Sequence, residues 1–132
     1  MKNNGFSLVE LIVVVLIMGI IAIALAPQVV KWVFTSRENT DEYSAKLLKS
    51  AALTSVAEYE SQGKTLKDGK YDVVHSGLRP VGTDQNEGLI PIMQSVMSGE
   101  CPKVQAEDGK IFRIQFWQND KKIEVVIVSG SY

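Results

Sequence analysis

Apolar residues are concentrated near the start of this 132-residue chain. Residues 11–30 form a run of 20 residues without a charged side chain, in which Gln28 is the only strongly polar residue. A helix of that length spans about 30 Å, which is the thickness of the hydrocarbon core of a bilayer. The pattern therefore predicts a helix that lies in a membrane or in the apolar core of an assembly.

Beyond this run the pattern stays helical but becomes amphipathic. Four apolar residues recur at spacings of four, four and three, which places them on one face of a helix: Leu48, Ala52, Val56 and Tyr59. Gly63 is a suitable helix stop. We expect one helix from residue 6 to about residue 62, with a kink at Pro27, because proline inside a helix removes a hydrogen bond and clashes with the preceding turn.

The alternation typical of strands appears in the last third of the chain. Apolar and polar residues alternate over 112–116 and again over 123–127, and residues 118–121 supply a hairpin loop between the two stretches. This period of two predicts a pair of antiparallel strands that cover a core with one face.

A second hairpin signal, Asp108-Gly109, lies just before these strands. It would join a strand at 103–106 to the strand that begins at Ile111. We therefore expect a three-stranded antiparallel meander at about 103–129, because a lone hairpin could not cover the helix stripe adequately.

The segment between the helix and the meander is less informative. Residues 71–74 read as a weak short strand, and the turn-forming residues of 77–88 indicate a loop. Residues 89–97 are expected to form a short helix with Pro91 in its first turn.

Together these patterns predict an α+β fold, in which a long kinked N-terminal helix packs against a small antiparallel sheet. Residues 6–30 would form the hydrophobic membrane or core half of the helix. Residues 31–132 would form a globular domain, which includes the amphipathic second half of the helix at 31–62.

Glu10 interrupts the apolar character of the N-terminal segment. A carboxylate at the centre of a lipid-exposed helix costs about 2.5–3.5 kcal/mol on insertion scales. Three interpretations of residues 1–30 compete: a secretory signal with A-x-A cleavage patterns at 22–24 and 24–26, a plain membrane anchor, and a segment cleaved before the apolar run. Glu10 favours the third, because an export signal or an inert anchor gains nothing from an ionisable residue.

The hexapeptide Gly5-Phe6-Ser7-Leu8-Val9-Glu10 resembles the processing site of type IV prepilins and pseudopilins. The resemblance covers the first 30 residues or so, from a short hydrophilic leader at 1–5 to Pro27. It implies that a prepilin peptidase removes the leader by cutting between Gly5 and Phe6, and then methylates the new Phe6 amine. It also implies that Glu10 pairs with the Phe6 amine of a neighbouring subunit and sets the register of assembly, and that the helix bends at Pro27.

The resemblance further implies a structural subunit of a type IV pilus with a pilin-like fold. The subunit would enter the cytoplasmic membrane as a single-pass precursor and then polymerise with copies of itself into a surface filament. An assembly ATPase and an inner-membrane platform would drive this step. Two alternatives stay open: a pseudopilin of a type II secretion or competence apparatus, and an exported or membrane-anchored binding domain. The choice among adhesion, motility and DNA uptake also stays open.

Composition offers little support for other chemistry. The formal net charge is −1 and the basic residues are interleaved with acidic ones, which gives no support for binding to nucleic acid. His75 is the only histidine, so a histidine-based triad or a multi-histidine metal site cannot form. P-loop and dinucleotide-binding motifs are absent from the sequence, and we expect the protein not to be an enzyme.

We also expect no cofactor. Asp84, Asn86 and Glu87 are oxygen ligands of a kind that Ca²⁺ prefers, but their spacing does not match an EF-hand loop and a solvated loop is the preferred interpretation. Cys101 is the only cysteine, so the sequence cannot form a disulfide within itself. We expect a partly buried small apolar residue there.

Overall fold

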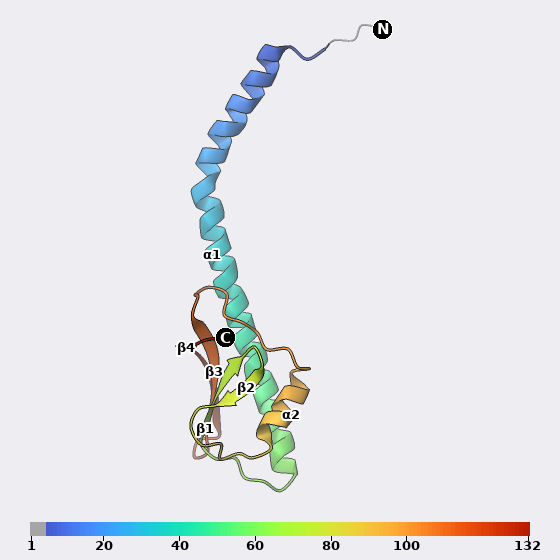
Figure 1. Ribbon diagram of the computed structural model, residues 1–132, viewed down its shortest axis with the longest axis vertical. Coiled ribbons are helices and arrows are strands. Elements are labelled where there is room, and N and C mark those ends of the chain that lie inside the picture. The colour runs from blue at the N-terminus through green and yellow to red at the C-terminus, as the bar shows by residue number, and fades with distance from the viewer. Residues whose placement is uncertain (1–4) are drawn as a thin grey trace. The chain divides into compact units, whose positions relative to one another are not determined.

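The computed structural model describes residues 5–132, and the chain divides into two compact units, Met1–Ser36 and Arg37–Tyr132. Helix α1, Leu8–Ser61, contributes residues to both units (Figure 1). Its length agrees closely with the predicted helix, although it begins at Leu8 rather than at residue 6. The leader proposed at 1–5 lies, apart from Gly5, outside the described residues.

In the first unit, every residue of α1 from Leu8 to Ser36 is exposed to solvent. The exposed side chains include large apolar ones such as Leu8, Ile20 and Ile23, which are 69–78% exposed. The helix continues without interruption through Pro27, so this proline does not end it. The bend expected at Pro27 stays a prediction.

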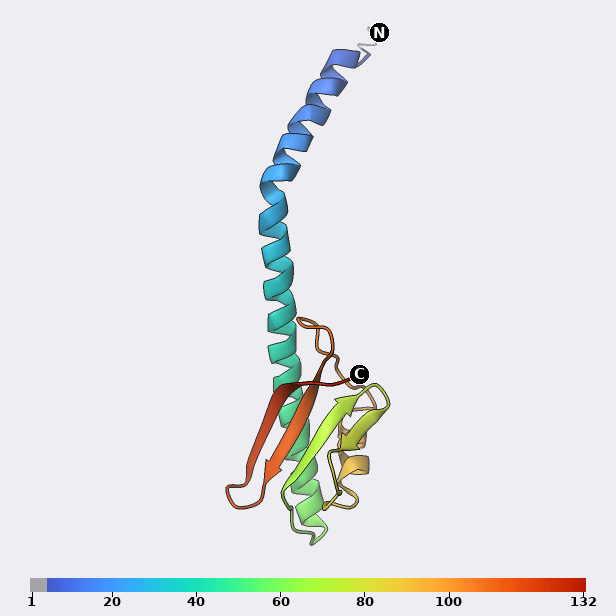
Figure 2. The ribbon, with the colours of Figure 1, turned by 60° about the vertical axis from the view of Figure 1, so that its left-hand side comes forward.

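The second unit contains a four-stranded antiparallel sheet with the strand order β2-β1-β3-β4 (Figure 2). Its strands are β1 (Gly69–Val74), β2 (Gly77–Pro80), β3 (Lys110–Trp117) and β4 (Lys122–Ser129). Tyr71 of β1 pairs with Ile114 of β3, and Phe116 of β3 pairs with Ile123 of β4. The β3–β4 hairpin is the one that the alternation of residues predicts.

The core of this unit lies between the sheet and the part of α1 that follows Arg37. Leu48, Ala52 and Tyr59 of the predicted stripe are buried and belong to the same hydrophobic cluster as Phe112 and Phe116 of β3. Val56 is only half-buried, and its neighbour Ser55 is fully buried instead. The Ser55 hydroxyl is satisfied by donating to the Ala51 carbonyl at 2.7 Å.

A short second helix, α2 (Leu89–Val96), completes the core and contacts β2. Leu89 and Met93 are both fully buried in the cluster. This helix matches the one expected at 89–97. The α+β fold class, with a long N-terminal helix packed against an antiparallel sheet, is therefore confirmed.

The predicted three-stranded meander is wrong at its first strand, because residues 103–106 form no strand. The N–H groups of Gln105 and Ala106 donate to the two carboxylate oxygens of Asp41 on α1, at 2.7 and 2.8 Å. Those donors therefore bind a side chain and not a neighbouring strand. Val104 still reaches the core, where it is 2% exposed.

The place of the missing strand beside β3 is taken by β1, which the sequence indicates only weakly. The segment expected as a loop at 77–88 begins with β2, which pairs with β1 from Gly77 to Pro80. Gly77 adopts the left-handed conformation, with φ of 126°, as the tight connection between the two strands requires. Asp108-Gly109 leads into β3 and does not form the predicted hairpin.

The replacement Asp41→Ala tests the contact between α1 and residues 105–106. We expect the free energy of unfolding to fall by about 1–3 kcal/mol, because two backbone donors lose a charged acceptor. Chemical denaturation of the full chain in detergent micelles, followed by near-ultraviolet circular dichroism, measures this change.

The adjacent replacement Glu42→Ala is the matched control. Glu42 is exposed and pairs with Lys46 on the helix surface at 2.7 Å, and exposed pairs of this kind contribute little to stability. Equal stability of the two variants would show that the Asp41 contact does not stabilise the fold.

Candidate functional site

The start of α1 is fixed by hydrogen bonds among residues 7–11. The Ser7 N–H donates to Oε2 of Glu10 at 2.8 Å, and the Val9 N–H donates to Oγ of Ser7 at 3.3 Å. The Leu11 N–H donates to the Ser7 carbonyl at 3.2 Å, which is a bond of the helical ladder. The two side-chain bonds form a variant of the capping box, in which the serine caps the N–H two residues on and a glutamate three residues later reaches back to the serine N–H.

Sequence reasoning found Glu10 but missed the role of Ser7. The signal was local, because S-x-x-E immediately before an apolar run is the sequence signature of a capping box. The sequence pattern draws attention to the charge of Glu10, whereas in the structure its carboxylate also accepts a hydrogen bond from the Ser7 N–H. The box also explains why α1 begins at Leu8.

Gly5 and Phe6, the predicted processing residues, precede the helix in irregular backbone. A Cβ atom placed on Gly5 would meet nothing within 4 Å. The Phe6 side chain is 83% exposed. Among residues 5–132, neither a contact nor a left-handed backbone requires glycine at position 5.

Residues 1–26 match the prokaryotic N-terminal methylation motif. The chain carries the type IV pilin-like signal. This motif includes Gly5, Phe6 and Glu10 and most of the apolar run. No curated protein and no solved structure matches the sequence.

The methylation motif supports a protein of the type IV pilin or pseudopilin type and points to a structural subunit. It implies processing by prepilin peptidase and entry into a pilus-type assembly machinery. Within residues 5–132, α1 is the one helix long and apolar enough to cross a membrane. Motif and helix together fit a membrane-anchored precursor.

The oxygen-rich loop considered for Ca²⁺ serves the fold through a buried network. Oδ1 of Asp84 accepts hydrogen bonds from the Tyr71 hydroxyl at 2.7 Å and from the Asn86 N–H at 3.0 Å. The fully buried Asn86 side chain bonds both the N–H and the carbonyl of Lys67, at 2.7 and 3.0 Å. Glu87 is exposed. Among the described residues, no group of three or more His, Cys, Asp or Glu side chains is arranged to hold a metal ion.

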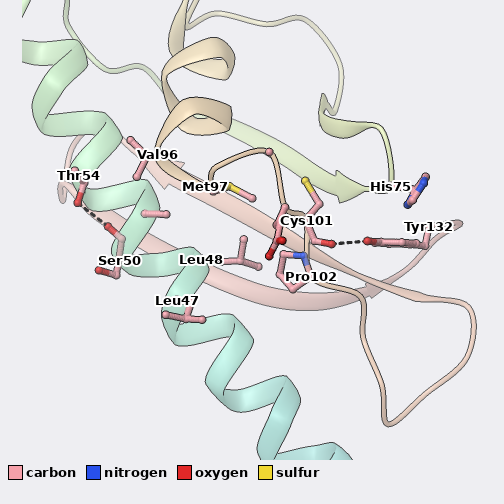
Figure 3. Close-up of a pocket in the computed structure, with 13 residues that line it drawn as sticks. Leu47, Leu48, Ser50, Thr54, His75, Val96, Met97, Cys101, Pro102 and Tyr132 are labelled. Carbon is pink, nitrogen blue, oxygen red and sulfur yellow. Dashed lines mark hydrogen bonds between the residues drawn. The ribbon is translucent and has the colours of Figure 1, made fainter.

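A pocket of about 730 Å³ opens in the second unit between α1, the end of α2 and residues 99–102 (Figure 3). Its lining is chiefly apolar and includes Leu48, Ala51, Val96, Met97 and Pro102.

On one side of the pocket the Tyr132 hydroxyl donates to the Cys101 carbonyl, and the Tyr132 ring lies 5.6 Å from the ring of His75 (Figure 3). His75 is exposed in the turn between β1 and β2. Burial raises the pKa of the half-buried Cys101 thiol. A protonated thiol is a weak nucleophile, which fits a packing role for Cys101.

The replacement Tyr71→Phe tests the network around Asn86. Burial, followed by the hydrogen bond to Asp84, raises the pKa of Tyr71 above its ordinary value of 10.0. The unfolded chain therefore loses the Tyr71 proton at lower pH than the folded chain does. This group stabilises the fold below about pH 10, and that contribution is lost as the pH rises further.

We expect Tyr71→Phe to be less stable than the wild type by about 1–3 kcal/mol at pH 8, because Asp84 loses the hydroxyl as a donor and Nδ2 of Asn86 loses it as an acceptor at 3.1 Å. Between pH 9 and 11, however, its stability should fall less steeply than that of the wild type. Denaturation curves across this range measure both effects, and Tyr43→Phe on an exposed part of α1 controls for the loss of a phenol. A slope identical to the wild-type slope would refute the assignment to Tyr71.

Proposed function

We propose that this chain is a structural subunit of a type IV pilus filament, which polymerises through α1 after a prepilin peptidase has removed residues 1–5. The observation that carries the proposal is the methylation motif at residues 1–26, placed directly on an apolar helix. The exposure of that helix supports it, because all residues from 8 to 36 are exposed.

Lipid would cover this apolar surface before assembly, and other subunits would cover it afterwards. Copies that associate head to tail without closing a ring form a fibre. Transfer from lipid to the filament core gains little hydrophobic free energy, since lipid is already apolar. An assembly ATPase and an inner-membrane platform would therefore supply the work of extraction, and the mature subunit would end in a filament on the cell surface.

Glu10 would set the register of this assembly. A carboxylate in an apolar bundle becomes tolerable when a cation and hydrogen-bond donors neutralise it. The methylated Phe6 amine of a neighbouring subunit would be that cation. A misplaced subunit would leave one negative and one positive charge unpaired, so the pair selects the correct stagger and adds little net stability.

A pseudopilin of a type II secretion or competence apparatus is the second candidate. The single Cys101 disfavours the commonest pilin pattern, in which two cysteines close a C-terminal loop, and so leaves a pseudopilin or a Gram-positive pilin open. Long surface fibres in electron micrographs of the native host would favour the pilin, and their absence would favour the pseudopilin. Neither candidate requires a cofactor or nucleic-acid binding by the subunit.

The N-terminus of the mature protein tests the processing step. We expect intact-mass measurement and N-terminal sequencing of the protein from its native host to show a chain that begins at Phe6 and carries one added methyl group. A chain that begins near Pro27 would mean that the apolar run is a discarded export signal, and the filament proposal would fail.

The replacement Glu10→Ala tests the register role. We expect the subunit to accumulate in the membrane while the yield of sheared filament falls about tenfold or more, because removing one partner of a buried charge pair costs about 3–5 kcal/mol. Glu38→Ala, which removes an exposed carboxylate from the polar part of α1, is the control. Normal filament yield from Glu10→Ala would rule out the pairing.

A further inference from the structure

The Ser7 hydroxyl takes the hydrogen bond that would otherwise extend α1 toward the N-terminus. In a continuous α-helix the Val9 N–H would donate to the carbonyl four residues earlier, which is that of Gly5. In this chain the Val9 N–H donates to Oγ of Ser7, at 3.3 Å. The carbonyl thereby left out of the helix belongs to the Gly5–Phe6 peptide bond.

Glu10 also helps to fix the N-terminal end of α1. Its carboxylate accepts the Ser7 N–H at 2.8 Å. A helix that began about a turn earlier would need that N–H for its own ladder, so both side chains of the capping box oppose extension of α1 by a full turn toward the N-terminus. Residues 5–7 accordingly have no helical structure.

We propose that Ser7 and Glu10 are positioning residues for leader removal, because their capping box holds the Gly5–Phe6 bond outside the helix. This inference rests on the proposed processing by prepilin peptidase. In the reaction, water adds across the Gly5–Phe6 bond. The bond between the Gly5 carbonyl carbon and the Phe6 nitrogen breaks, the carbon gains the oxygen of water and becomes a carboxylate, and the nitrogen gains both protons and becomes the new ammonium group.

The cap affects cleavage because it keeps the Gly5 carbonyl oxygen out of the hydrogen bonds of the helix. Hydrolysis requires access to the Gly5 carbonyl carbon and hydrogen-bond donors for its oxygen as negative charge develops there. A Gly5 oxygen bonded to the Val9 N–H within a helix would be withheld from those donors. The box therefore keeps the reacting group available, while the apolar helix can begin only two residues beyond the bond that is cut.

This role of Glu10 is separable from its role in assembly. The third helical position of a capping box accepts glutamine as well as glutamate, because an amide oxygen also accepts the serine N–H. Glu10→Gln therefore keeps the box and removes the charge, whereas Glu10→Ala removes both. At position 7, threonine keeps the hydroxyl, and valine has nearly the same shape without it.

The experiment compares cleavage of the full-length precursor in detergent micelles by a prepilin peptidase, with leader release followed by mass spectrometry. We expect Ser7→Thr and Glu10→Gln to be cleaved at close to the wild-type rate. Ser7→Val and Glu10→Ala should be cleaved more slowly, by up to about fivefold, which is the factor by which loss of a typical N-cap shifts a helix equilibrium.

Backbone chemical shifts of residues 5–9 provide the second measurement, because direct recognition of the serine by the peptidase would not change them. In Ser7→Val the shifts should move toward helical values at Gly5 and Phe6, and in Ser7→Thr they should not. Equal cleavage of Ser7→Val and Ser7→Thr, or unchanged shifts in Ser7→Val, would overturn the capping role alone. A wild-type precursor that is not cut at Gly5–Phe6 would overturn the proposed function itself.

Discussion

Burial of one face of α1 on the sheet is the interaction on which the rest of the globular unit depends. Leu48, Ala52 and Tyr59 supply an apolar surface long enough for β1 and β3 to cover. Tyr71 of β1 and Phe112 and Phe116 of β3 are buried there as a result. Between Leu8 and Ser36 the residues of the same helix are exposed. One helix thus carries two surfaces, of which one is buried on the sheet and the other is exposed and largely apolar.

Polar contacts hold together the parts of this unit that apolar packing does not align. The Arg113 side chain of β3 makes two hydrogen bonds to the Asp72 carboxylate of β1, at 2.5 and 3.1 Å. Asn86 binds the backbone of Lys67, and Asp41 binds residues 105–106. Throughout residues 5–132, each buried side-chain nitrogen and oxygen has a hydrogen-bond partner. The sequence has one cysteine, so these polar contacts link segments that disulfides often link in small exported domains.

Sequence periodicity predicts the elements that local patterns determine: α1, α2 and the β3–β4 hairpin. The prediction of a strand at 103–106 fails, because Gln105 binds a side chain on α1 that lies 64 residues earlier in the sequence. The local pattern of apolar and polar residues does not reveal such a distant partner. The residues of the methylation motif are found from the sequence, since they are contiguous. The network of Tyr71, Asp84 and Asn86 is not, because only the folded sheet brings Lys67 close to it.

The bonds from Gln105 and Ala106 to Asp41 also bear on how the unit folds. They close a loop of more than 60 residues, and the entropy lost in closing such a loop is recovered only when other contacts already hold its ends together. Helices and the β3–β4 hairpin can form from near neighbours in the sequence, whereas this contact needs most of the chain in place. Slow hydrogen exchange at these two amides, in a segment without regular structure, would therefore report completion of the fold rather than local order.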